Sequence, residues 1–60
     1  MKTYTITVAE YVDGGKIYEG KTYHGFVKTD YGPYPEAYEG IAEGDEVIFL
    51  LHELKKIDEE

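Results

Sequence analysis

The sequence predicts an α+β fold, a three-stranded antiparallel sheet with one short helix between strands 2 and 3 (β-β-α-β). Three observations predict it. Residues 3–12 and 16–28 are rich in β-branched and aromatic residues and flank two glycines, as in a β-hairpin. Residues 35–39, Pro-Glu-Ala-Tyr-Glu, have the composition of a helical turn. Residues 47–51 form a continuous apolar run, which predicts a third strand.

The hairpin turn is expected at residues 13–16, Asp-Gly-Gly-Lys, because glycines accept the positive φ of a tight turn. A two-residue turn at Gly14-Gly15 places Asp13 opposite Lys16 and thereby sets the register. The expected core face consists of Ile6, Val8, Val12, Ile17, Tyr23 and Val27. Gly20 and Gly25 interrupt the second strand and indicate bulges.

The helix is expected to begin at Pro35, whose missing N–H costs nothing at a first helical position, and to end at Gly40 or Gly44. Residues 47–57 are ambiguous, because their apolar positions also fit a helical stripe. A strand is favoured, since Val-Ile-Phe is β-rich and a hairpin alone needs a third strand. Five apolar residues in a row predict a central strand buried on both faces, and residues 58–60 a frayed tail.

Length and composition exclude several classes of protein. Sixty residues are expected to form one domain, residues 1–60, with little core, so oligomerisation is the expected extra source of stability. There is no cysteine, and the two histidines are 28 positions apart, which predicts neither a disulfide nor a metal site. No serine exists, and no catalytic or cofactor motif is recognisable, so we expect no enzyme and no cofactor. No apolar stretch is long enough to span a membrane, which predicts a cytoplasmic protein.

Negative charge is concentrated in the second half of the chain. Residues 1–29 hold four lysines against three acids, a net charge of +1, whereas residues 30–60 hold ten acids against two lysines, a net charge of -8. One interpretation is a solvated acidic face that aids solubility. The other is a surface that imitates a polyanion, for which a DNA-binding protein is the complement. Nucleic acid itself is excluded as a partner, because phosphates need basic neutralisation.

Tyrosines accompany these acids. Seven of the 60 residues are tyrosine, and Tyr31, Tyr34 and Tyr38 cluster beside Glu36 and Glu39. Tyrosine is enriched in binding hot spots, although such rings also cover sheets in ordinary cores. Aromatic rings between acids, rather than between bases, argue against stacking on nucleic-acid bases and favour a protein partner with a basic groove.

The sequence resembles the small acidic inhibitors that certain tailed Bacillus phages make against host uracil-DNA glycosylase. The matching residues follow the same order along the chain: Tyr4, Ile6-Thr7, Asp13, Gly15-Lys16, Tyr18, Tyr23-His24, Gly25, Thr29-Asp30-Tyr31 and Asp45-Glu46-Val47-Ile48. The resemblance implies a homodimer in the bacterial host's cytoplasm that mimics DNA. In that family, acidic side chains stand in for phosphates, and an apolar pocket captures the leucine that the glycosylase inserts into DNA.

The resemblance also implies which residues contact the glycosylase. Tyr31 matches the family's aromatic contact at the helix start, Glu36 its acidic contact and Tyr38 its later tyrosine. Residues 32–35 look like an insertion, which makes Tyr34 the alternative to Tyr31. The expected partner-binding residues are Tyr31, Tyr34, Glu36, Tyr38, Glu39 and Glu43. The alternative function is a small SH3-like barrel that binds a peptide or protein through its tyrosines, and it predicts a monomer with five strands.

Overall fold

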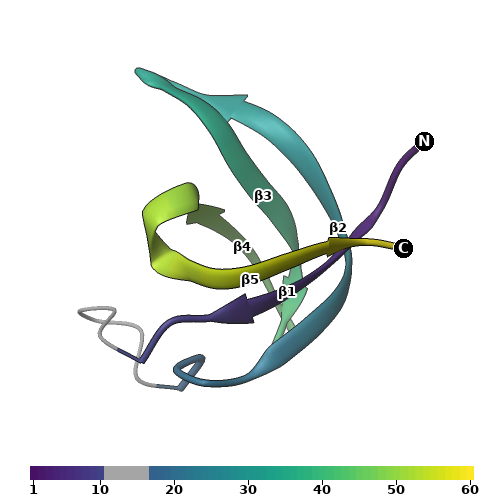
Figure 1. Cartoon of the computed structure of the whole chain (residues 1–60), viewed down its shortest axis with the longest axis vertical. Coiled ribbons are helices and arrows are strands. Elements are labelled where there is room, and N and C mark those ends of the chain that lie inside the picture. Colours follow the sequence, from purple (N-terminus) through teal and green to yellow (C-terminus); the bar gives the residue numbers. More distant parts are fainter. Residues whose placement is uncertain (11–16) are drawn as a thin grey trace.

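The computed structural model describes residues 1–10 and 17–60, which form a strongly curved antiparallel sheet (Figure 1). The sheet has five strands in the order β4-β3-β2-β1-β5. One turn of 3-10 helix, η1, joins β4 to β5. The elements along the chain are β1 (Tyr4–Val8), β2 (Thr22–Tyr31), β3 (Tyr34–Ala42), β4 (Asp45–Leu50), η1 (Leu51–Glu53) and β5 (Leu54–Glu59).

The predicted β-β-α-β fold is wrong, because residues 36–39 lie in β3 and the described residues contain no α-helix. The physical reason is the alternation along Tyr34–Ala42, which places every second side chain on the same face of a strand. Pro35 is tolerated in β3 because the register of the β2–β3 pair shifts between Ala37 and Tyr34, so that Pro35 lies at an irregularity of the ladder. The number of strands is the one that the SH3-like alternative predicted.

The third predicted strand exists as β4, but it is an edge strand and not a central one. Its side chains alternate between core and surface: Phe49 is buried, whereas Ile48 is 38% exposed. The chain then turns through η1 and returns as β5 beside β1, so residues 58 and 59 are strand rather than a frayed tail. None of the helical structure in the described ranges is long enough to cross a membrane.

The predicted register of the first hairpin holds for two pairs, Ile6 opposite Tyr23 and Thr7 opposite Thr22. Residues 17–20, predicted as part of the second strand, form a turn instead, and Ile17, predicted in the core, is 58% exposed. The predicted turn at residues 13–16 lies outside the described residues. Beyond Tyr23 the register shifts by one residue, at Gly25, whose φ is +74°. A one-residue shift reverses the faces of the strand, so Phe26 is fully buried in place of the predicted Val27.

The same shift divides β2 between two strand partners, since its first half pairs with β1 and its second half with β3. The core lies inside the resulting fold, with the Phe26 and Phe49 rings 6.0 Å apart at its centre. Gly40 lies against Phe26 so closely that a Cβ at Gly40 would be 2.8 Å from the ring. On β3, Tyr38, Gly40 and Ala42 therefore form the core face, which leaves Glu39 and Ile41 on the opposite face.

The two ends of the described chain meet on one side of the molecule (Figure 1). The backbone N–H of Glu60 donates to the carbonyl oxygen of Thr3 at 2.9 Å. The β1–β5 pair continues to this point, with Tyr4 opposite Glu59.

Candidate protein-binding groove

The face of β2, β3 and β4 that points away from the core forms a concave groove of about 810 Å³. Its floor consists of side chains that lie side by side on neighbouring strands. Val27, Glu39 and Ile48 form one cross-strand row, and Ile41 lies opposite Glu46 in the next. The residues that line the groove are Gly25, Val27, Tyr31, Glu39, Gly40, Ile41, Glu46, Val47, Ile48, Leu50 and Glu53.

The floor is apolar and open to solvent. Ile41 is 58% exposed and Ile48 is 38% exposed, while Tyr31 at one end is 52% exposed. Val27 and Leu50 are half-buried between them. Contiguous exposed apolar side chains on a small domain are typical of an interaction site, whereas single exposed apolar side chains are normal on any protein surface.

Three carboxylates also line the groove: Glu39, which lies between Val27 and Ile48, and Glu46 and Glu53. No lysine is among the lining residues. Glu53 is partly engaged, since its Oε1 accepts a hydrogen bond from the Leu50 N–H at 2.8 Å. Glu39 and Glu46 are exposed and form no ion pair within residues 1–10 and 17–60. The groove therefore has a net negative potential.

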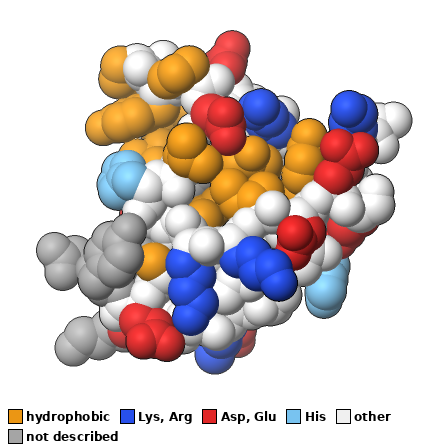
Figure 2. All heavy atoms as spheres, in the orientation of Figure 1, with side chains coloured by type: hydrophobic (Ala, Val, Ile, Leu, Met, Phe, Trp, Pro, Cys, Tyr) orange, Lys and Arg blue, Asp and Glu red, His pale blue; other side chains and the backbone are white. Residues whose placement is uncertain are grey.

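Elsewhere in the described ranges, the lysines are paired with acids. Every lysine in the described ranges forms an ion pair, and the pairs are Lys2–Glu59, Lys21–Glu43, Lys28–Glu36, Lys55–Glu10 and Lys56–Asp58. Acidic and basic side chains accordingly lie next to each other on the face shown in Figure 2. The excess negative charge of the chain is left on the remaining carboxylates, and three of these line the groove.

The structure places the predicted partner-binding residues on different surfaces. Tyr31 and Tyr34 lie opposite each other at the tip of the β2–β3 hairpin and are exposed. Hydrophobic side chains gather at this tip in Figure 2. Tyr31 and Glu39 line the groove, but Glu36 does not, because it lies an odd number of residues from Glu39 on the same strand. On the predicted helix, Glu36 and Glu39 would have shared one face, whereas β3 places them on opposite faces.

Tyr38 and Glu36 form a structural pair. The Tyr38 ring is 3% exposed and packs edge-on against Tyr4 at 5.4 Å. Its hydroxyl donates to Glu36 Oε2 at 2.9 Å, and Lys28 Nζ lies 3.4 Å from Glu36 Oε1. Burial, and then the hydrogen bond to Glu36, raise the pKa of Tyr38 to about 12. Tyr38 therefore presents no ring surface to a partner.

Glu43 is held in a similar way, in the turn between β3 and β4. Glu43 and Gly44 both have positive φ, 53° and 83°, as a tight two-residue hairpin turn requires. The Tyr23 hydroxyl donates to Glu43 Oε2 at 2.8 Å, and Lys21 lies 3.3 Å away. The hydrogen bonds from Tyr23 and Lys21 lower the pKa of the Glu43 carboxyl.

Sequence reasoning missed the apolar floor, namely Val27, Ile41 and Ile48. The signal was present as the alternation of Ala37, Glu39 and Ile41 with the core residues of the same segment. The helix predicted from Pro35 onward is incompatible with this alternation. Glu46 is not among the predicted partner-binding residues, although it lines the groove.

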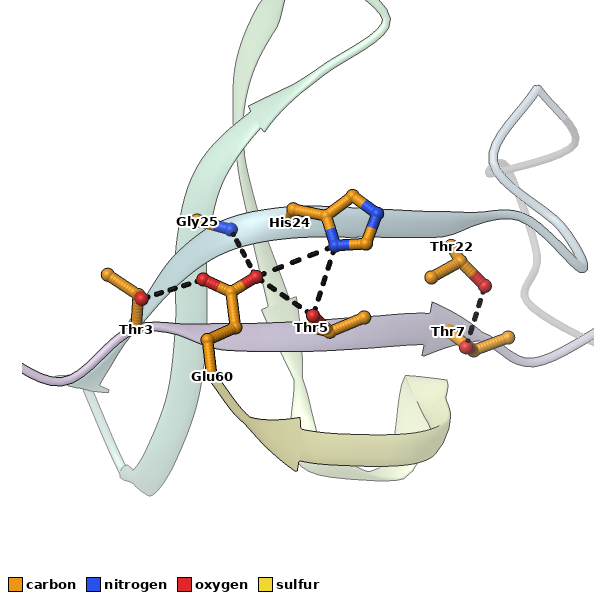
Figure 3. A network of polar contacts seen from close by, with 7 residues as sticks. All are labelled: Thr3, Thr5, Thr7, Thr22, His24, Gly25 and Glu60. Atoms are coloured by element: carbon orange, nitrogen blue, oxygen red, sulfur yellow. Dashed lines mark hydrogen bonds and ion pairs between the residues drawn. The ribbon is translucent and has the colours of Figure 1, made fainter.

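A second polar cluster lies on the outer face of β1 and β2, around the Glu60 carboxylate (Figure 3). Glu60 accepts hydrogen bonds from Thr3 Oγ1 at 2.7 Å, Thr5 Oγ1 at 2.8 Å and the Gly25 N–H at 3.1 Å. These bonds, in that order, lower the pKa of Glu60 to about 2. His24 Nδ1 contacts both Thr5 Oγ1, at 3.0 Å, and Glu60 Oε2, at 3.5 Å. A catalytic triad needs the two partners on different ring nitrogens, so this cluster does not form one.

Comparisons with protein-family models, with curated proteins and with solved structures find no match to this chain.

Proposed function

We propose that this protein is a small β-sheet binding module that holds a protein segment carrying both basic and apolar side chains in the groove on β2, β3 and β4. The observation that carries the proposal is the coincidence of two properties at one place. The groove has an exposed apolar floor, and it is bordered by carboxylates without a lysine beside them.

The carboxylates and the apolar floor of the groove together favour a partner segment that has both basic and apolar side chains. A basic segment would complete the ion pairs that Glu39 and Glu46 lack, and it would be attracted by the net charge of -7. Burial of Ile41 and Ile48 would add affinity that salt does not screen. We therefore expect the affinity to fall as the salt concentration rises, but part of it to remain at high salt.

A second copy of the chain is a poor occupant of the groove. Two groove faces brought together would place Glu39 and Glu46 of one copy beside the same carboxylates of the other, and like charges repel. The predicted homodimer would have to use another surface.

Inhibition of uracil-DNA glycosylase is a more specific candidate function. It rests on the resemblance of the sequence, and the groove favours it in one respect: carboxylates beside an apolar floor are what the resemblance implies for contacts with a DNA-binding protein and its protruding leucine. The contacts would differ from those expected, since Tyr38 is buried and Glu36 is paired with Lys28. The test is uracil release from a uracil-containing oligonucleotide, and undiminished release with excess protein would eliminate this candidate.

The general proposal is tested with a fluorescein-labelled peptide built from repeats of Lys-Thr-Val-Thr, with Glu-Thr-Val-Thr repeats as the control peptide. Fluorescence polarisation measures affinity, and nitrogen-15 NMR shifts identify the contacted residues. We expect binding of the lysine peptide alone, with shifts at Val27, Ile41 and Ile48. Absence of binding, or shifts confined to other faces, would contradict the proposal.

A matched pair of variants separates the groove from net charge. Glu39→Lys with Glu46→Lys is expected to weaken binding by about tenfold or more, a loss of about 1.4 kcal/mol. Glu19→Lys with Asp30→Lys makes the same change in net charge at carboxylates that do not line the groove. Equal losses in the two double variants would show that binding follows the overall charge and not the groove.

A further inference from the structure

The structure also indicates how the partner segment binds, and this inference rests on the proposed function. We propose that the segment is extended and adds to the sheet as a sixth strand along the free edge of β4. Its lysines and apolar side chains would then extend the face that forms the groove.

The free edge of β4 has unpaired backbone groups in the right places. In an antiparallel pair, successive residues direct their N–H and C=O groups alternately toward the partner strand and away from it. The Leu50 N–H donates to Glu53 Oε1, at 2.8 Å, and thus points away from β3. By alternation, Glu46 and Ile48 also direct their backbone groups outward. Within residues 1–10 and 17–60, β4 pairs with β3 alone, and none of the backbone hydrogen bonds of turns and loops involves Glu46 or Ile48.

The side chains of these same residues line the groove. Glu46, Ile48 and Leu50 lie on its floor and border. A strand that bonded to the outward groups of Glu46 and Ile48 would therefore set every second side chain beside them, on the groove face. The Glu53 carboxylate already occupies the Leu50 N–H, so the added strand would end there.

The other edge of the sheet is protected against such addition. β5 has four charged residues among six, Lys55, Lys56, Asp58 and Glu59, and edge lysines discourage strand pairing. β4 instead has four apolar residues in a row, 47–50, and no lysine. An apolar edge strand is a template for pairing with another chain, and here the acids around it select a basic one.

N-methylated versions of the Lys-Thr-Val-Thr peptide test this inference. One version carries the methyl groups on the threonine nitrogens, and the other carries them on the lysine and valine nitrogens. An added strand forms hydrogen bonds to β4 either through the backbone N–H groups of its threonines or through those of its lysine and valine residues, but not through both. We expect one version to lose about tenfold or more in affinity and the other to bind like the parent.

Hydrogen exchange supplies a second readout. The Ile48 amide is expected to exchange rapidly in the free protein and slowly in the complex, whereas the Phe49 amide, which points toward β3, is protected in both. If both methylated peptides bind like the parent, or both lose affinity equally, strand addition is excluded while the groove proposal stands. If the parent peptide does not bind, the proposed function itself fails. Protection of Ile48 without peptide, together with a dimer by light scattering, would show that a second copy occupies the edge and would overturn the inference.

Discussion

Glu36 and Glu39 lie three residues apart on β3 and have opposite surroundings. Glu36 accepts a hydrogen bond from the buried Tyr38 and pairs with Lys28. Glu39 lies on the other face of the strand, between Val27 and Ile48, with no lysine beside it. The acidity of this chain therefore has two parts: carboxylates that are bonded within the fold, such as Glu36, and carboxylates that line the groove without a lysine beside them, such as Glu39.

The largest effect on stability is expected on the core face of β3. Gly40→Ala would place a Cβ 2.8 Å from the Phe26 ring, which is fully buried. We expect a loss of about 1–3 kcal/mol in the free energy of unfolding, measured by urea denaturation. Ile41→Val, on the adjacent groove-facing residue, should change it by less than about 0.5 kcal/mol. Comparable losses in both variants would remove the distinction between the two faces.

A smaller effect is expected at the paired carboxylate. Tyr38→Phe removes the hydroxyl that donates to Glu36 and should cost about 1 kcal/mol in the free energy of unfolding. Glu39→Gln serves as the counterpart from the groove and should cost less than about 0.5 kcal/mol. A stable Tyr38→Phe variant, or a destabilised Glu39→Gln variant, would mean that the assignment of structural and free carboxylates is reversed.

The smallest effect is expected at Glu60, which is close to solvent, and it depends on pH. Because its folded-state pKa is lowered to about 2 from an ordinary 4.5, the ionised carboxylate stabilises the fold above pH 4.5. That contribution is lost as the pH falls from 4.5 toward 2. In thermal melts across this range, the difference in Tm between the wild type and Glu60→Gln should decrease to zero as the pH falls. A difference in Tm that persists at pH 2 would contradict the role given to the Thr3, Thr5 and Gly25 bonds.

Part of the first hairpin was predictable because its signals are local, but residues 17–20 form a turn where a strand was expected. Alternation gave the strands, and the expected two-residue turn gave the register of Ile6 and Tyr23. The exchange of Val27 for Phe26 in the core was not predicted. The position of Gly25 indicated a bulge. A bulge in β2 reverses the faces of the later residues only if β1 has no extra residue at the same place, and the pairing with β1 is a long-range feature that the local sequence does not give.

The segment 34–42 shows the opposite case. Local propensity favoured a helix at Pro-Glu-Ala-Tyr-Glu, and pairing with β2 and β4 overrode it. Because of this single wrong assignment, the predicted binding surface was wrong as well. A helix would have placed Glu36, Glu39 and Glu43 on one surface, whereas a strand separates them. The acidity and the tyrosines were correctly noted, but their distribution over two faces follows only from long-range pairing.

The bond between Glu60 and Thr3 has a practical consequence. Since Thr3, near the beginning of the described chain, is a hydrogen-bonded neighbour of Glu60, a short glycine-rich linker could connect the two ends at a small entropic cost, because short closures between adjacent ends need little ordering. A circular permutant opened at Gly32-Pro33, in the exposed turn of the β2–β3 hairpin, would retain all five strands in their present order in space.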